Sequence, residues 1–375
     1  MKALKKDVNS IAISSLRRCY SNNGIYAGLH QFKDFWARDS FYASFGALEI
    51  GDLDIVKRNL SLFLHFEKQG IIPLRIGNKF FIQTMLGKRP KRLFAKFNDD
   101  KKGSFCSDSQ TLFLISFARY IKKVKDSNFA DKNATKIIRI IRTLFSHTQK
   151  NFLLYENYYS TWMDAIKKKG YIFYSNLLYY SALDEIFKLY SKKSINLGYD
   201  KAFLNSLFNK IQSTFWKDDH FTDWLGNNKH DYFDTFANLL AIYLGFASKK
   251  QSRKIFGFID EKRMVNRFGA IKKSFPNYPK NLISKRMRAI GLLGYCSKIY
   301  YPWMSFFYFY CLKDFEILDS SMKLAEESLL KRVFGQKEVF EAWDFSLKPY
   351  YSLFYYSEHP FAWACSFLVL LCSKY

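Results

Sequence analysis

This chain of 375 residues lacks the short motifs that mark metal and cofactor sites. Its six histidines include no HExxH pair, and there is no GxGxxG turn or phosphate-binding loop. The six cysteines have no CxxC or other metal-binding spacing, and several lie in apolar runs, as small core residues of a reducing compartment do: Cys19, Cys106, Cys296, Cys311, Cys365 and Cys372. We therefore expect neither a metal nor a cofactor.

Long apolar runs and domain linkers are also missing. The longest apolar run, Phe361 to Cys372, is too short to span a bilayer, and residues 1–20 lack the apolar region of a signal peptide. No stretch rich in proline and serine, and no change in composition, separates two parts of the chain. We expect a single domain over residues 1–375 that is cytoplasmic and has no membrane partner. The oligomeric state stays open.

Acidic residues are scarce, because 33 Asp and Glu face 59 Lys and Arg, a formal charge of +26. Such an excess suggests a polyanionic partner. Here, however, the basic residues are scattered in pairs and triplets, such as Lys122-Lys123 and Lys167-Lys168-Lys169, and are not gathered into one arm. We interpret them first as a solvated surface and do not expect nucleic acid as the partner. The alternative, a polyanion-binding helical protein, predicts binding that falls steeply with salt and ignores sugars.

The chain is rich in hydrophobic residues (49%) and aromatic residues (19%), which is enough for a large buried core. Apolar residues return every three or four positions along most of the sequence, which is the period of a helix. This pattern predicts twelve helices, near 5–19, 36–49, 53–68, 108–123, 132–147, 171–193, 198–216, 231–247, 249–260, 301–314, 316–334 and 359–373.

Several of these helices are joined by short polar or glycine-containing links, which imply antiparallel helical hairpins. Longer links fall between the hairpins and leave the first and last helices to pair with each other; these links are 69–107, 148–170, 217–230, 261–300 and 335–358. Six hairpins arranged in this way predict an all-α (α/α)6 toroid, whose inner helices converge on a funnel. The periodicity alone also allows a helical solenoid or an irregular bundle, although no solenoid repeat is visible.

An Arg-Asp pair, Arg38-Asp39, follows Trp36 and precedes Ser40-Phe41. Its carboxylate can bind sugar hydroxyls while the guanidinium holds that carboxylate in place, and the aromatic rings offer a flat apolar face to a pyranose. An internal ion pair that locks the start of a helix explains the same residues equally well.

Ser107-Asp108 opens the helix predicted at 108–123. By local criteria either residue is the N-cap of that helix. Asp108 becomes a candidate site residue because the helix it begins should belong to the inner ring.

Two irregular, aromatic segments each carry an acidic residue beside tryptophan. In Thr161-Trp162-Met163-Asp164-Ala165, the apolar neighbours favour the protonated form of Asp164, as a general acid requires, although a helix cap is the simpler local interpretation. In Glu341-Ala342-Trp343-Asp344, the acidic residues precede a last helix that carries Trp363. Two such carboxylates are the usual minimum for glycoside hydrolysis.

With these segments, the chain resembles the (α/α)6-barrel glycosidases, especially the amylo-α-1,6-glucosidase domain of glycogen debranching enzymes and the glycoside hydrolase family 63 and trehalase relatives. Trp36 to Phe41 resembles their Arg-Asp-Ser/Thr motif, and Thr161 to Ala165 is the longest match. Asn176 with Tyr179-Tyr180 resembles their Asn-x-Leu-x-Tyr helix, and Glu341 to Asp344 resembles the Glu-x-aromatic-Asp/Asn loop of family 63-type enzymes.

The resemblance implies an inverting hydrolase of an α-glucoside or a related oligosaccharide, with Asp164 as general acid and Glu341 as general base. Their carboxyls should then stand roughly 6.5–9.5 Å apart, which leaves room for a water. The glycine-rich tail that usually follows this Glu is absent, so Glu358 and then Glu338 stay open as alternative bases. The partner implied is a carbohydrate, and the substrate-binding residues implied are Trp36, Arg38, Asp39, Asp108, Trp162, Asn176, Trp343 and Trp363, with Trp303 as a further candidate wall.

Two other functions remain open on the same fold. Phosphate can replace the activated water, which gives phosphorolysis. A toroid without catalysis can bind glycans or serve as a scaffold; the presence of both candidate carboxylates favours an enzyme.

Overall fold

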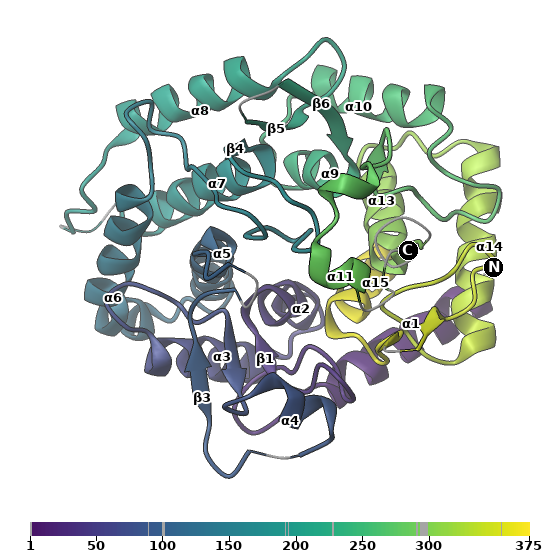
Figure 1. Cartoon of the computed structure of the whole chain (residues 1–375), viewed down its shortest axis with the longest axis horizontal. Coiled ribbons are helices and arrows are strands. Elements are labelled where there is room, and N and C mark those ends of the chain that lie inside the picture. The colour runs from purple at the N-terminus through teal and green to yellow at the C-terminus, as the bar shows by residue number, and fades with distance from the viewer. Residues whose placement is uncertain are drawn as a thin grey trace.

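The computed structural model describes residues 2–88, 90–99, 102–191, 193, 195–226, 229–289, 292, 299–353 and 355–375. Its long helices form two concentric rings (Figure 1). The inner ring consists of α2 (Ala37–Glu49), α5 (Ser107–Val124), α7 (Phe173–Tyr190), α9 (Thr235–Tyr243), α13 (Pro302–Asp314) and α15 (Ala362–Ser373). The outer ring consists of α1 (Lys2–Arg18), α3 (Leu53–Phe66), α6 (Ser127–Ser146), α8 (Lys201–Phe215), α10 (Lys249–Glu261) and α14 (Ser320–Gln336).

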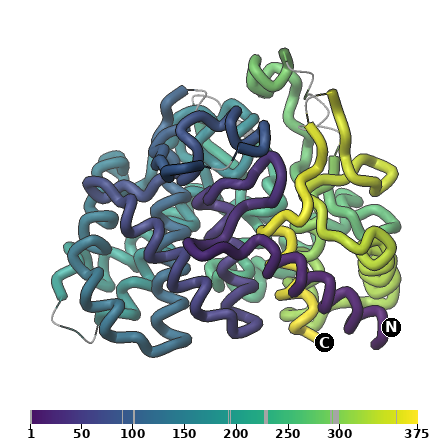
Figure 2. The backbone as a smooth tube through the Cα atoms, turned by 90° about the horizontal axis from the view of Figure 1, so that it is seen from below, coloured from purple at the N-terminus to yellow at the C-terminus, as the bar shows by residue number. Residues whose placement is uncertain are grey.

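The inner ring is closed. Each inner helix contacts the next in the order α2, α5, α7, α9, α13 and α15, and α15 returns to contact α2. Helix α1 packs against α15, so the first and last helices form the sixth hairpin, and the two chain ends lie near each other (Figure 2). The predicted (α/α)6 toroid is therefore confirmed, and an open solenoid is excluded.

Burial explains which helices are inner and which are outer. Every residue of α15 from Ala362 to Cys372 is buried, as in a helix surrounded by protein on all sides. In α6, by contrast, the buried residues recur at helical spacing on one face: Ala130, Asn133, Ile137, Ile140, Ile141 and Leu144. Five of the six cysteines are buried thiols, as expected of core residues, and Cys296 lies outside the described residues.

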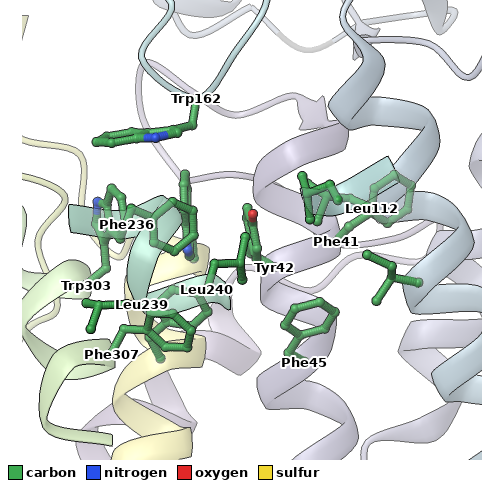
Figure 3. Packing of buried hydrophobic residues seen from close by; sticks show 14 of the residues in the cluster. Phe41, Tyr42, Phe45, Leu112, Trp162, Phe236, Leu239, Leu240, Trp303 and Phe307 are labelled. Atoms are coloured by element: carbon green, nitrogen blue, oxygen red, sulfur yellow. The ribbon is translucent and has the colours of Figure 1, made fainter. Parts of the chain in front are cut away.

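Aromatic rings fill the middle of the inner ring. Trp363 stacks on Trp303, with 4.1 Å between ring centroids, and on Tyr42, with 4.5 Å. Phe236 meets Trp303 edge to face at 5.0 Å, and the Trp162 ring lies across this cluster at its upper end (Figure 3). The toroid therefore has a solid floor in place of an open channel.

Three small antiparallel sheets, which the helical pattern did not predict, are built from the links. They are β1 (Phe35–Trp36) with β2 (Arg75–Gly77) and β3 (Phe94–Lys96); β4 (Tyr171–Ile172) with β5 (Thr222–Leu225), β6 (Lys229–Asp234) and β7 (Ser274–Phe275); and β8 (Tyr351–Ser352) with β9 (Tyr355–Tyr356). The helix predicted at 231–247 begins only at Thr235, because the preceding residues pair with β5 and β7.

The links also contain the short helices α4 (Phe81–Met85), η1 (Lys280–Leu282) and α11 (Lys285–Ala289). Strands β1, β4 and β6 each run directly into an inner helix, so the sheets lie at the end of the toroid where inner helices begin. No helix among the described residues is both long and apolar enough to cross a membrane.

A close approach of α2 to α15 depends on Gly46. Its N–H donates to Ser366 Oγ at 2.7 Å, and that hydroxyl donates to the Tyr42 carbonyl at 2.7 Å. A Cβ at position 46 would lie 2.6 Å from Ser366 Cα, which is backbone that cannot move aside alone. Any larger residue at position 46 would force these two helices to shift apart.

We predict that Gly46→Ala lowers the free energy of unfolding by about 1–3 kcal/mol, because the added methyl overpacks the α2–α15 contact. The matched control is Gly257→Ala on α10, where nothing lies within 4 Å of the added Cβ. There alanine's helix propensity should stabilise the protein by up to about 1 kcal/mol. Urea unfolding of both variants measures the difference, and equal effects would contradict this account of ring closure.

Candidate active site

A cavity of about 140 Å³ lies at the end of the toroid where the inner helices begin. It receives side chains from the starts of α2, α13 and α15 and from the links between hairpins. Its lining residues are Phe32, Trp36, Arg38, Asp39, Leu74, Asp99, Cys106, Tyr159, Trp162, Asp164, Tyr301, Trp303, Glu341, Phe361 and Trp363.

The structure brings together most of the residues singled out from the sequence. Both carboxylates expected to be catalytic, Asp164 and Glu341, line this cavity although they come from links far apart in the chain. Trp303, the further candidate wall, also lines it. Five of the expected substrate-binding residues join them: Trp36, Arg38, Asp39, Trp162 and Trp363.

Three expected substrate-binding residues do not line the cavity. Asn176 is fully buried, and its side-chain amide accepts from Leu154 N–H at 2.9 Å and donates to the Leu154 and Ile172 carbonyls. Trp343 is buried in the core, where its backbone pairs with that of Tyr300. Both have structural positions in place of the sugar contacts expected for them.

Asp108, the third, lies behind the cavity and holds Arg38. Arg38 donates from Nε to Asp108 Oδ2 at 2.6 Å and from Nη2 to the Thr161 carbonyl at 2.9 Å. This guanidinium therefore links α2, α5 and the segment that carries Asp164, while it also borders the cavity. Arg38 thus fits both interpretations of the Arg38-Asp39 motif. It forms an internal ion pair, with Asp108, and it lines the cavity.

The two alternative bases lie away from the cavity lining. Glu358 is fully buried and accepts hydrogen bonds from the backbone N–H groups of Leu29, His30 and Phe32. Glu338 is bonded to Arg18 and Ser15 on the side of α1. Of the three glutamates considered from the sequence, Glu341 is the one that faces the cavity.

Glu341 has a phenol partner that the sequence did not reveal. Tyr355 Oη donates to Glu341 Oε2 at 2.5 Å, and both residues are buried. Burial and the charge of Glu341 raise the pKa of Tyr355 well above its usual value, so the phenol keeps its proton. Such a donor stabilises the ionised form of the carboxylate, which is the form a general base needs.

Asp39 is a further carboxyl of the cavity lining, which also includes Asp99. Burial raises the pKa of Asp39 to about 7; the Arg38 guanidinium opposes this rise, and the charges of Glu341 and Asp164 add to it. Asp39, Glu341 and Asp164 therefore interact electrostatically, and a change of charge at one alters the proton affinity of the others.

A buried ionic cluster fixes the segment that carries Asp164. Lys168 is 1% exposed and lies 2.6 Å from Asp223 and 3.7 Å from Asp234. Tyr278 Oη donates to the same Asp223 at 2.5 Å, and Trp162 Nε1 donates to Asp234 at 2.9 Å. Asp164 therefore lies between two anchored neighbours, Trp162 and Lys168.

This cluster corrects the view of the Lys167-Lys168-Lys169 triplet as solvated surface. Lys169 is exposed, but the middle residue points inward, above the rings of Trp224 and Tyr278. Its partners Asp223 and Asp234 come from a different link, β5 and β6, which no local pattern could pair with it.

The aromatic walls leave unused hydrogen-bond donors. The Trp162 ring meets Trp303 edge to face at 5.5 Å, and Trp36 meets Phe81 in the same way at 5.4 Å. Within the part of the chain that the structure describes, the buried indole N–H groups of Trp36 and Trp363 have no acceptor. Indole N–H groups normally find a partner when buried, so these two donors suit a polar ligand in the cavity.

No protein-family model and no curated protein matches this sequence. Solved structures do match. A rhamnosidase from Klebsiella oxytoca with rhamnose bound superposes with a TM-score of 0.70 at 12% identity. The match covers 99% of this chain and 64% of the rhamnosidase, so this chain spans less than two thirds of the rhamnosidase's length. A glycosidase in complex with glucose matches with a TM-score of 0.70 at 10% identity, over 99% of this chain and 97% of that one.

A sugar epimerase from a ruminal bacterium matches with a TM-score of 0.62 at 11% identity, over 99% of this chain and 98% of that one. At these identities the likeness concerns the fold. The chain thus has the six-hairpin fold that these glycosidases and the epimerase share.

We predict that Lys168→Met lowers the free energy of unfolding by about 3–5 kcal/mol, because it leaves two buried carboxylates without a counter-charge. Lys169→Met is the control, since this neighbouring side chain is exposed and surface changes usually stay within about 0.5 kcal/mol. Urea unfolding compares the two. Equal midpoints would show that the ionic cluster does not fix the Asp164 segment.

We also predict a pH-dependent effect of Asp39→Asn. The pKa of Asp39 rises from 3.8 to about 7 on folding, so between these values the folded protein holds a proton that the unfolded chain has lost. Stability from this group therefore falls as pH rises through that window. The variant should gain stability relative to wild type from about pH 4 to about pH 7 and stay level above it, as measured by urea unfolding. A difference that is constant with pH would contradict the shift.

Proposed function

We propose that this protein is an inverting glycoside hydrolase that acts on an α-glucoside or a related oligosaccharide, with Asp164 as general acid and Glu341 as general base. The observation that carries the proposal is that Asp164 and Glu341 line one aromatic-walled cavity at the mouth of a glycosidase-type toroid. The resemblance of the Thr161 to Ala165 segment to amylo-α-1,6-glucosidases supports the choice of an α-glucoside.

In the proposed reaction, the Asp164 carboxyl gives its proton to the glycosidic oxygen as the bond between that oxygen and the anomeric carbon breaks. A water on the opposite face of the ring attacks the same carbon while Glu341 takes up one of the water's protons. The products are the free sugar with inverted anomeric configuration and the alcohol that was attached to it. Proton exchange with solvent then restores both carboxyls.

The other lining residues fit this role. Tyr355 supports the ionised form of Glu341 through its 2.5 Å hydrogen bond. The carboxyl of Asp39, beside Arg38, can bind sugar hydroxyls, and Trp36, Trp162 and Trp363 form apolar walls. A cavity of about 140 Å³ suits a single terminal sugar ring and not a long polymer. We therefore infer that the substrate is cleaved at its non-reducing end.

Sugar epimerisation is the second candidate, because the ruminal epimerase matches this chain over nearly the full length of both proteins. It would convert a free sugar into its isomer and release no alcohol. The lining carboxyls, and Glu341 with its phenol donor, favour hydrolysis.

The proposal predicts that Asp164→Asn and Glu341→Gln each lower kcat by about 10²–10⁴-fold, the usual contribution of a general acid or base. The assay measures sugar released from α-linked disaccharides and aryl α-glucosides, with and without added phosphate. Proton NMR of the first product identifies its anomer, which should be the inverted one.

Glu338→Gln is the matched control, since Glu338 pairs with Arg18 away from the cavity and its variant should keep wild-type kcat. Full activity of both site variants would refute the assignment of acid and base. Turnover that depends on phosphate would indicate phosphorolysis, and a free sugar that changes into its isomer would indicate the epimerase. Sugar binding without turnover would indicate a glycan-binding toroid.

A further inference from the structure

Three segments project from the end of the toroid that holds the cavity, opposite the chain ends (Figure 2). They are residues 79–88 with 90–94, which include α4; α11; and residues 344–353, which lead into the β8–β9 hairpin. We call them the rim segments. Their positions are seen face-on in Figure 1, where α4 and α11 lie on the near side of the ring.

The rim segments expose large apolar side chains. Leu86 is 69% exposed and Ile82 is 57% exposed, both on or beside α4, and Leu353 is 89% exposed before the β9 strand. Aromatic side chains on the same segments are also exposed, namely Phe80, Phe94, Phe345 and Tyr351. Scattered exposed apolar residues are ordinary, but a group at one end of a protein marks an interaction surface.

Two of the rim segments, residues 79–88 with 90–94 and α11, are strongly basic. The described residues from 79 to 98 include no acidic side chain. The third segment, 344–353, carries one acidic side chain, Asp344, which accepts from the backbone N–H groups of Ser346 and Lys348, and one basic side chain, Lys348. The exposed basic residues of the rim segments are Lys79, Lys88, Lys91, Arg92, Lys285, Arg286, Arg288 and Lys348. The rim segments taken together therefore suit an anionic partner.

Contrary to the expectation from the sequence that the protein has no membrane partner, we propose that the rim segments dock on the surface of an anionic phospholipid bilayer. Aliphatic side chains such as Ile82, Leu86 and Leu353 gain free energy by entering the boundary between headgroups and acyl chains, while lysine and arginine bind the anionic headgroups. A soluble polyanion such as RNA would neutralise the charges but would leave these aliphatic side chains in water. The combination of apolar tips and basic flanks favours the bilayer.

Each rim segment is joined to the wall of the cavity. Phe81 of α4 packs on Trp36 at 5.4 Å, and Ser284, just before α11, donates from its N–H to the Ala165 carbonyl at 2.8 Å. The third segment pairs through Ser352 with Tyr355 of β9, and Tyr355 donates to Glu341. Docking would therefore hold the cavity close to the lipid surface. This last step rests on the proposed hydrolase activity: with the cavity held at the lipid surface, the enzyme would select glycans carried at a membrane surface.

The test is co-sedimentation of the full chain with vesicles of pure phosphatidylcholine and with vesicles that also contain phosphatidylserine. We expect binding only to the anionic vesicles, and weaker binding as salt increases. The combined substitution Ile82→Ser and Leu86→Ser should weaken binding at least about tenfold, because two inserted side chains are lost. Lys88→Gln, Lys91→Gln and Arg92→Gln together should weaken it by about 100-fold, at roughly fivefold for each charge near the surface.

Matched controls lie on the outer ring, away from the rim. Leu324→Ser with Phe334→Ser on α14 removes two exposed apolar side chains, and Lys249→Gln, Lys250→Gln and Arg253→Gln on α10 removes three exposed charges. Both control variants should bind vesicles as wild type does. Asp164→Asn should also bind fully, which separates docking from the chemistry of the cavity.

The proposal is overturned if anionic vesicles are not bound at low salt. It is also overturned if the charge variants on α10 weaken binding as much as those on the rim, because the net charge alone would then explain it. Binding to RNA or heparin that depends on the rim charges but not on Ile82 and Leu86, together with no vesicle binding, would identify a soluble polyanion as the partner.

Discussion

Helix α15 closes the inner ring by packing between α2 and α13, at a point where Gly46 lets two backbones meet. Closure of the ring at this contact brings links from distant parts of the chain around one cavity. The link before α7 carries Asp164 and the link before α15 carries Glu341, and an open stack of hairpins would hold them apart. Closure also places the aromatic cluster around Trp303 and Trp363 under the cavity, so the cavity has a floor.

Buried charges then hold the links on this frame. Arg38 bridges Asp108 and the Thr161 carbonyl, and Lys168 bridges Asp223 and Asp234. A buried ion pair adds little net stability over an apolar replacement, but losing one partner is costly. We therefore see these pairs as devices that keep the Asp164 segment in one geometry. Rigid placement of this kind is what proton transfer between a side chain and a substrate requires.

Lysine and arginine residues occupy different environments in different parts of the fold. Lys168, for example, is buried and lies beside the carboxylates of Asp223 and Asp234. Others project from outer helices into solvent, as Lys249 and Lys250 do on α10. The rim segments concentrate a further group beside exposed apolar side chains. A formal charge of +26 by itself therefore says little about function. The position of each basic residue decides whether it stabilises the fold, keeps the surface solvated or contributes to a binding surface.

The sequence by itself predicted the twelve long helices and their pairing into six hairpins, because apolar spacing and link length are local properties. The structure was needed to show that the ring closes, since the periodicity also allowed an open solenoid or an irregular bundle. The sequence also pointed to Trp36, Arg38, Asp39, Trp162, Asp164, Glu341 and Trp363, which the structure gathers around one cavity, while their chemical roles remain predictions. Only the tertiary structure decided that Lys168 is buried, that Asn176 binds backbone and that Tyr355 bonds Glu341. The small sheets belong to the same group, since their strands come from separate links. Each of these features depends on contacts between residues distant in the chain, and periodicity carries no information about such partners.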